Sequence, residues 1–213
     1  MPWPDGADQG FYVEYFFYCR DRPGIGDLRW ELAEAHWSFM DRYADAMIAR
    51  GPTLADDDAE SVTGSMHLVD LPDAAAAQAF AFEEPYCKAG VFGEVLIRRW
   101  GNILGRTMWD FSGSGGRRFL VIGHGAPEAT VRRAGLRGQQ LDYLAAGGYR
   151  DGLIACGPLL SESGTEWLGT AMLVELADRT AAEAMMADGP YARAGLYEEV
   201  EIHNWRFGGR PQE

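Results

Sequence analysis

His36 is the side chain in this sequence best suited to moving a proton at neutral pH. Imidazole has an unperturbed pKa of about 6.5, so it takes up and returns a proton under ordinary conditions. Arg29 precedes His36 by seven residues, or about two turns of an α-helix, so the two side chains would share one helix face. This spacing is compatible with general acid/base chemistry beside a cation. The plain alternative is a polar helix histidine bonded to a neighbour.

An amphipathic helix is predicted to carry both side chains. Apolar residues recur at three- and four-residue steps from Asp27 to Ala49, and Asp27 is available to cap the N-terminus. The apolar positions are Leu28, Leu32, Ala35, Phe39, Tyr43 and Met47. Residues 47–54, which include Gly51-Pro52, are expected to form the end of this helix and a short extended segment.

The sequence repeats its landmarks about 105 residues later, which is too long a period for a solenoid unit. The matching landmarks are Gly51-Pro52 and Gly157-Pro158, Gly64 and Gly169, Pro85-Tyr86 and Pro190-Tyr191, Ala89-Gly90 and Ala194-Gly195, and Trp100 and Trp205. The chain therefore predicts two fused copies of one domain. Its expected parts are an N-terminal tail at 1–10, a first domain at 11–111, a flexible Gly/Ser linker at 112–116 and a second domain at 117–208.

Both copies predict the element order βαββαβ. In the first copy we expect strands at 11–19, 47–54, 64–70 and 91–100, with helices at 27–49 and 73–82 and a helical turn from 84. In the second copy we expect strands at 118–123, 153–158, 169–176 and 199–207, with helices at 132–146 and 179–187. This order is the ferredoxin-like arrangement of the α+β class.

Such a domain leaves one face of its antiparallel sheet uncovered, because both helices lie on the other face. An uncovered apolar face needs a partner, and the second copy can supply one. We therefore expect the two sheets to pack face to face as an intramolecular α+β barrel. A monomer or a loose homodimer is the expected state.

Composition excludes several functions. The formal net charge is -13, from 32 acidic against 19 basic side chains, and this balance argues against nucleic acid as a partner. The acidic run Asp56-Asp57-Asp58-x-Glu60 is expected to be a solvated loop rather than a metal site. No Gly-rich phosphate loop or paired metal-ligand spacing stands out, so neither a cofactor nor a metal is expected.

The three cysteines, Cys19, Cys87 and Cys156, are isolated and lack CxxC spacing, which favours free thiols in a reducing compartment. The first residues lack a basic start followed by an apolar stretch, and nowhere do about 18 apolar residues run together. We therefore expect a soluble cytoplasmic protein without a membrane partner.

These motifs resemble the YCII-related proteins, small members of the dimeric α+β barrel superfamily. In the first copy the resemblance rests on Arg29-x6-His36-x2-Phe39-Met40 and Glu84-Pro85-Tyr86-x2-Ala89-Gly90-Val91. In the second copy it rests on Arg133-x6-Gln140-x2-Tyr143-Leu144 and Gly189-Pro190-Tyr191-x2-Ala194-Gly195-Leu196. With the landmarks above, it covers nearly the whole chain and implies a tandem duplication.

The resemblance implies an active site built on the first-helix histidine and the acidic residue before the Pro-Tyr pair. In this sequence the histidine is His36. The acidic residue is Glu84, at a position where the resemblance implies aspartate. A carboxylate near an imidazole can fix its tautomer and stabilise its charged form. The second copy has Gln140 and Gly189 instead, so it is expected to be a degenerate site.

The expected function is that of a cofactor-independent small-molecule enzyme, of the lyase, isomerase or dehydrohalogenase type. His36 would be its acid/base, Glu84 the orienting partner, and Arg29 and Tyr86 the substrate contacts. Arg29 could instead pair with Glu84, and Tyr86 and His67 could be packed rings. An organic acid or a phenolic compound is the expected ligand. The alternative is a non-catalytic protein that binds a small metabolite in the same cleft.

Overall fold

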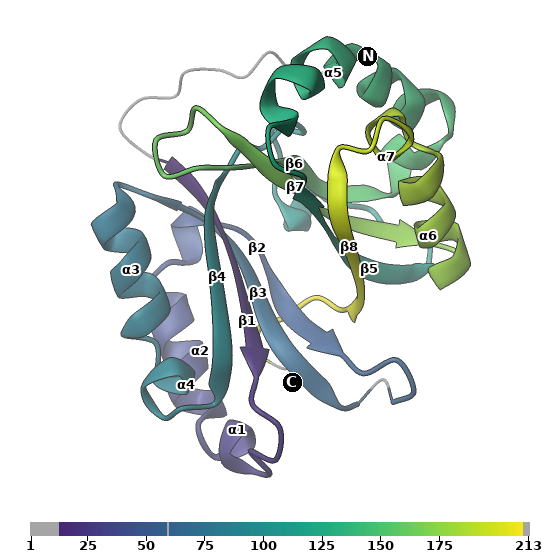
Figure 1. Ribbon diagram of the computed structural model, residues 1–213. Coiled ribbons are helices and arrows are strands. Elements are labelled where there is room, and N and C mark those ends of the chain that lie inside the picture. Colours follow the sequence, from purple (N-terminus) through teal and green to yellow (C-terminus); the bar gives the residue numbers. More distant parts are fainter. Residues whose placement is uncertain (1–12, 59, 211–213) are drawn as a thin grey trace. The chain divides into compact units, whose positions relative to one another are not determined.

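The structure is a computed structural model and describes residues 13–58 and 60–210 (Figure 1). The chain forms two compact units. Of the described residues, those from 13 to 98 and from 205 to 210 form the N-terminal unit, and Arg99–Asn204 form the C-terminal unit. Strands and helices follow the βαββαβ order in each copy, so the predicted α+β class is confirmed. The tail predicted at 1–10 lies outside the described residues.

In the N-terminal unit, strand β3 lies between β1 and β2 and runs antiparallel to both. The elements of the first copy are β1 (Val13–Asp21), α1 (Leu28–Glu31), α2 (Ala33–Asp41), the 3-10 turn η1 (Ala44–Ala46), β2 (Met47–Leu54), β3 (Val62–Leu71), α3 (Ala74–Phe82), α4 (Pro85–Lys88) and β4 (Phe92–Trp100).

Helices α2 and α3 cover one face of this sheet (Figure 1). Phe17 on β1 and Phe80 on α3 are buried, with ring centroids 4.6 Å apart, and Val69 on β3 belongs to the same apolar cluster. Burying an aromatic side chain of this kind contributes about 1.5–3 kcal/mol. This core fixes α2, which carries His36, against the sheet.

The C-terminal unit repeats the pattern, with β5 lying between β7 and β8 and β7 pairing also with β6, all antiparallel. The elements of the second copy are β5 (Arg117–Gly125), α5 (Ala129–Ala146), the 3-10 turn η3 (Tyr149–Gly152), β6 (Leu153–Leu160), β7 (Trp167–Leu176), α6 (Arg179–Asp188), α7 (Pro190–Arg193) and β8 (Tyr197–Trp205). The face-to-face packing of the two sheets and the oligomeric state stay predictions.

The single helix predicted at 27–49 is wrong over its last third. It is interrupted at Leu32 between α1 and α2, and α2 ends at Asp41. Met47 pairs with Val69 of β3 and belongs to the buried core. Its apolar side chain fits the helical spacing, but the residue is part of a strand. Asp27 does precede α1, but its side chain makes no capping hydrogen bond.

The Gly/Ser segment predicted as a flexible linker at 112–116 is tied down instead. The carboxylate of Glu175 accepts hydrogen bonds from the backbone amides of Ser114 and Gly115, at 2.5 and 3.1 Å. Arg118 donates to the second oxygen of Glu175 at 2.9 Å. A buried carboxylate with this many donors orders the segment that supplies them.

The chain passes from one unit into the other at the end of each copy. Strand β4 ends at Trp100, which pairs with Leu159 of the C-terminal unit. Beyond β8, the amide of Arg206 donates to the carbonyl of Pro52 at 3.3 Å, in the N-terminal unit. A Cβ on Gly51 would overlap with the carbonyl oxygen of Arg206, so only glycine permits this approach.

Candidate active site

His36 and Glu84 meet in the N-terminal unit, as the sequence predicted. Nδ1 of His36 lies 2.5 Å from Oε1 of Glu84, and the two residues are 8% and 2% exposed. The second oxygen of Glu84 accepts from the amide of Cys87 at 2.9 Å, where Glu84 caps α4. Because both carboxylate oxygens are bonded, Glu84 is held in one orientation towards the imidazole. Among the described residues, Nε2 of His36 has no hydrogen-bond partner.

Tyr86 stacks on the imidazole of His36, with centroids 4.2 Å apart and planes at 12°. Its ring is 4% exposed, so the packed-ring interpretation holds for most of the side chain, although Tyr86 also lines the pocket. Burial raises the pKa of Tyr86 to about 12, despite the nearby Arg29. The phenol is therefore protonated at neutral pH and can act as a hydrogen-bond donor.

Arg29 does not pair with Glu84. Its Nη1 lies 2.6 Å from Oδ1 of Asp21, and its Nη2 donates to the hydroxyl of Ser65 at 2.5 Å. Its guanidinium carbon lies 4.6 Å from the ring centroid of Tyr86, a cation–π contact. Burial raises the pKa of Asp21 to about 6, while the Arg29 guanidinium opposes that rise. Arg29 thus holds β1, β3 and α4 together at one side of the site.

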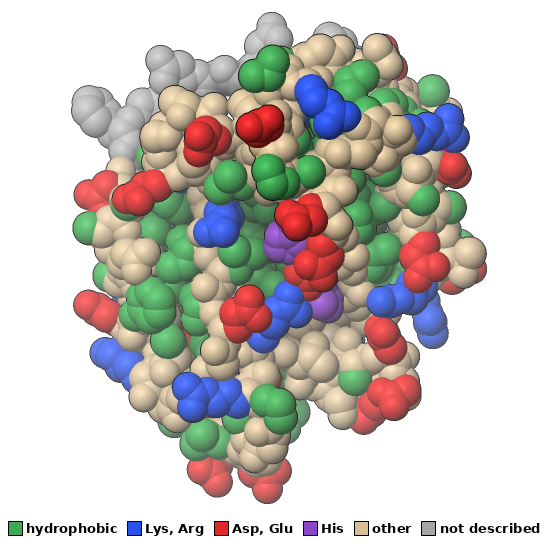
Figure 2. Space-filling view, in the orientation of Figure 1, with side chains coloured by type: hydrophobic (Ala, Val, Ile, Leu, Met, Phe, Trp, Pro, Cys, Tyr) green, Lys and Arg blue, Asp and Glu red, His purple; other side chains and the backbone are tan. Residues whose placement is uncertain are grey.

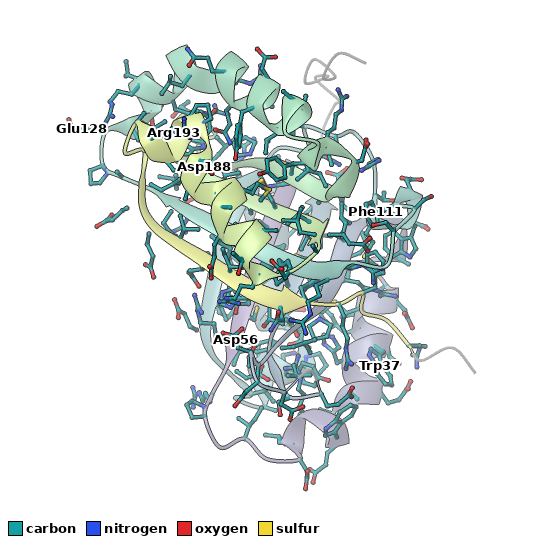
Figure 3. The ribbon with its side chains drawn as sticks, turned by 90° about the vertical axis from the view of Figure 1, so that its right-hand side faces the viewer. Trp37, Asp56, Phe111, Glu128, Asp188 and Arg193 are labelled. Carbon is teal, nitrogen blue, oxygen red and sulfur yellow. The ribbon has the colours of Figure 1, made fainter. Side chains whose placement is uncertain are left out.

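A pocket of about 140 Å³ is lined by His36. Its floor is the helix-facing side of the sheet, where Arg50 and Pro52 on β2 lie directly opposite His67 and Ser65 on β3. Its other lining residues come from β2, β3, α1, α2, α4 and the segment after β8. They are Gly51, Val62, Arg29, Trp30, Ala33, His36, Trp37, Met40, Tyr86 and Arg206 to Gly209. Trp37 marks the position of α2 in Figure 3.

His67 faces this pocket from β3, with its ring centroid 5.9 Å from that of His36. It is 4% exposed and packs edge-on against Phe80. Burial lowers the pKa of His67 well below its ordinary value, and His36, Arg50 and Arg29 lower it further. The packed-histidine interpretation is therefore incomplete, because a neutral imidazole also lines the cavity.

The C-terminal unit has a much smaller counterpart, of about 30 Å³. Gln140 lies at the position of His36, Met172 at that of His67, and Cys156 at that of Arg50. Gly189 replaces Glu84, and the ion pair of Asp188 with Arg193, at 3.2 Å, flanks it (Figure 3). The predicted loss of the His–carboxylate pair in the second copy is thus accompanied by loss of the space for a ligand.

The two remaining histidines lie elsewhere. His124 and His203 in the C-terminal unit each bond one carboxylate oxygen of Glu201, at 2.6 and 2.8 Å. On the face of the molecule drawn in Figure 2, histidine side chains lie beside acidic ones. Within residues 13–58 and 60–210, no group of three or more His, Cys, Asp or Glu side chains is arranged to hold a metal ion.

Sequence reasoning missed Asp21, Arg50, Arg206 and the orientation of His67. Asp21 ends β1 and binds Arg29. Alternation along β2 places Arg50 on the same side as Pro52, and this signal was available once the strand was recognised. Arg206 could not be found from the order of elements, because it follows the second copy and lines the pocket of the first.

The fold and site define an α+β protein of two ferredoxin-like halves, with a buried His–carboxylate pair in one of them. The family model of the YCII-related domain matches residues 13–101 and again 118–206. The chain therefore belongs to the YCII-related domain family, as a tandem duplication. No curated protein matches it in sequence. Among the helices of the described residues, none is long and apolar enough to cross a membrane.

Solved structures resemble the chain over different extents. Chlorite dismutase from Candidatus Nitrospira defluvii matches at 9% identity over 91% of each chain, with a TM-score of 0.59. An anthrone oxidase-like protein matches at 12% identity, covering 94% of this chain and 92% of the other, with a TM-score of 0.54. At these identities, the two matches show the fold alone.

A third structure is similar to about one half of the chain. It is 5-chloro-2-hydroxyhydroquinone dehydrochlorinase from Burkholderia phenoliruptrix AC1100, in complex with 2,5-dihydroxybenzoquinone. The match has 26% identity and a TM-score of 0.39, and covers 41% of this chain and 93% of the other.

Proposed function

We propose that the pocket of the N-terminal unit is an active site that moves a proton on a small organic substrate, with His36 as the general acid/base. The observation that carries this proposal is the contact of 2.5 Å between Nδ1 of His36 and Oε1 of Glu84, in a buried position. When Nδ1 carries a proton and donates to the carboxylate, Nε2 presents its lone pair. A substrate in the pocket would meet that nitrogen.

The chemistry follows from these roles. Nε2 of His36 removes a proton from the substrate, and the carboxylate of Glu84 stabilises the imidazolium that forms. The same proton is then returned to a different substrate atom, as in an isomerisation, or to the leaving group of a lyase reaction. In a dehydrohalogenation the halide would leave with the electron pair of the carbon–halogen bond, and the proton would pass from His36 to solvent. Tyr86 fixes the plane of the imidazole through their stacked rings. This scheme needs no cofactor.

Pocket size limits the substrate. An apolar cavity of about 150 Å³ holds a benzene molecule, so a pocket of about 140 Å³ suits one ring or a compact chain. Trp30, which is 65% exposed, and Trp37 line the same pocket and offer flat apolar surface to such a molecule.

Solvent-exchange measurements test the proposal even though the product is unidentified. A panel of small organic acids and phenols is incubated with the protein in D2O and followed by proton NMR for loss of C–H signal and by mass spectrometry for products. We expect at least one compound to exchange or react, and His36→Gln to slow it by about 10²- to 10⁴-fold. An equal rate in His36→Gln would contradict the proposal.

The same panel separates catalysis from binding alone. Each compound is also tested for a rise in melting temperature. Compounds that stabilise the fold without exchange or turnover across the panel would favour the non-catalytic alternative, in which His36 only hydrogen-bonds a metabolite. Exchange lost together with His36 would exclude that alternative.

A further inference from the structure

The pocket of the N-terminal unit is cationic although the chain as a whole is strongly acidic. Three arginines and two histidines line it, and none of its lining residues within the described part of the chain is an Asp or Glu. This cationic lining contrasts with the formal net charge of -13. A cationic pocket attracts anions and repels other cations.

The three arginines are not equivalent. Arg29 is already neutralised, because Asp21 lies 2.6 Å from it and both side chains are nearly buried. Arg50 lies 4.0 Å from Asp41, and Arg206 lies 3.8 Å from Glu60, whose side chain is 86% exposed. Both of these ion pairs are longer than that of Arg29, and both arginines line the pocket.

Arg50 and Arg206 lie on neighbouring segments. The backbone of Arg50 accepts from Gly208 at 3.0 Å, and that of Pro52 accepts from Arg206 at 3.3 Å, so the segment after β8 runs beside β2. Arg50 is also directly opposite His67 on β3. Two guanidinium groups and a neutral imidazole therefore line the same pocket floor and wall.

The C-terminal unit provides an internal comparison. The positions of Arg50, Arg206 and His67 are occupied there by Cys156, Gly101 and Met172. All three polar groups are absent from the pocket that has also lost the His–carboxylate pair. Arg29, in contrast, keeps its counterpart in Arg133, which bonds the hydroxyl of Tyr191 at 3.2 Å. Both units therefore have an arginine at the position of Arg29. Arg50, Arg206 and His67, in contrast, occur only in the unit that has the His–carboxylate pair.

We propose that this pocket binds a compact organic anion, with Arg50 and Arg206 holding its charged group and His67 donating a hydrogen bond beside Arg50. The proposal deepens the function proposed above, because it names the ligand class of the same pocket. Guanidinium groups bind carboxylates through paired N–H donors, and a neutral imidazole offers one more. The carbon skeleton would then lie towards His36, Trp37 and Tyr86.

Calorimetric titration with benzoate tests this assignment, using benzamide as a neutral molecule of nearly the same shape. We expect benzoate to bind at least about tenfold more tightly than benzamide, and Arg50→Gln and Arg206→Gln each to weaken benzoate by about tenfold or more. Benzamide binding should not change. Arg98→Gln is the control, because Arg98 is exposed, lies outside the pocket and loses the same charge.

Several results would overturn the assignment. These are equal binding of benzoate and benzamide, no benzoate binding, undiminished binding in both pocket variants, or an equal loss in Arg98→Gln. Inorganic phosphate binding as tightly as benzoate would contradict an organic ligand. If Arg50→Gln unfolds, Arg50→Lys is used in its place, because it keeps the positive charge but loses the paired N–H donors of the guanidinium group. His36→Gln should still bind benzoate, so failure of the proton-transfer function would leave this result intact and distinguishable.

Discussion

Gln140 of the C-terminal unit accepts a hydrogen bond from the backbone amide of Tyr191 at 3.1 Å. This contact joins α5 to α7, as the His36–Glu84 pair joins α2 to α4 in the N-terminal unit. A glutamine therefore satisfies the structural part of the arrangement without supplying a titratable group. What the N-terminal unit adds is a base, a carboxylate and an open pocket.

His36→Gln should retain the fold and lose catalysis, because Gln140 shows that glutamine can bridge the same two helices. The expected loss is about 10²- to 10⁴-fold in the rate of proton exchange, measured on any substrate found in the panel. Gln140→His is the matched control, and we expect it to change the activity little, since His36 and Glu84 are intact and Gly189 offers no carboxylate to the new histidine. Unfolding of His36→Gln would instead identify His36 as a core residue.

Glu84→Gln should lower kcat far more than it changes KM. An amide oxygen can still cap α4 at Cys87, but a neutral side chain cannot stabilise an imidazolium and can favour the wrong tautomer of His36. We expect a loss of about 10²-fold or more, as seen where an amide replaces the carboxylate beside a catalytic histidine. Glu83→Gln, at the exposed neighbouring position, should behave as the wild type.

His67→Met should reduce the acid sensitivity of the fold. The pKa of His67 is well below its ordinary value of 6.5, because it is buried and faces His36, Arg50 and Arg29. Below about pH 6.5 the unfolded chain therefore binds a proton that the folded chain does not, so stability falls as pH falls in this window and is complete above it.

Methionine at position 67 removes that proton uptake and copies Met172. Urea unfolding at pH 7 and pH 5 should show that His67→Met loses less free energy of unfolding on acidification than the wild type, by up to about 1.4 kcal/mol per pH unit. Equal losses in the two proteins would show that His67 is not held neutral.

Gly51→Ala should destabilise the protein by about 1–3 kcal/mol, the usual cost of an overpacked site. The new Cβ would meet the backbone of Arg206 and, at 2.7 Å, the indole nitrogen of Trp205. Gly138→Ala is the opposite case, since the site is exposed on α5 with nothing within 4 Å of the new Cβ. We expect it to stabilise by about 0.5–1 kcal/mol. Urea unfolding of both variants measures the contrast.

Glu175→Gln should weaken the attachment of residues 112–116. Burial raises the pKa of Glu175, but the hydrogen bonds from Ser114 and Gly116 and the nearby Arg118 prevail and hold it below its usual range. The stabilisation is therefore present above about pH 4.5 and is lost as pH falls through the lower folded pKa. We expect a cost of about 1–2 kcal/mol at pH 7 and a smaller one at pH 3, by urea unfolding.

The order of elements and the His36–Glu84 contact could be predicted from sequence, because both depend on local patterns. Apolar alternation identified the strands, and the Pro85-Tyr86 motif placed Glu84 at the start of a helical turn. The end of α2 could not be placed, since residues 42–49 fit a helix by spacing, whereas Met47 and Ala49 pair with β3. Only tertiary contacts decide between those two outcomes.

Ion-pair partners and pocket walls depend on register rather than on composition. Asp21 and Arg29 are eight residues apart and meet because β1 ends beside α1. Arg206 lies 170 positions after His36, and no local pattern connects them. The sequence thus predicted the elements that carry His36 and Glu84, but not the arginines that line the same pocket.

The segment from Trp205 to Arg210, at the end of the second copy, contributes to the pocket of the first copy. Arg210 binds Glu34 at 2.6 Å and Asp41 at 3.0 Å, on the helix of His36, and Arg206 to Gly209 form one wall of the pocket. Cutting the chain between its two copies would therefore give a first half with the base but without that wall. The first copy carries the His36–Glu84 pair, and the segment that follows the second copy lines the pocket of that pair. The pocket therefore depends on the whole duplicated chain.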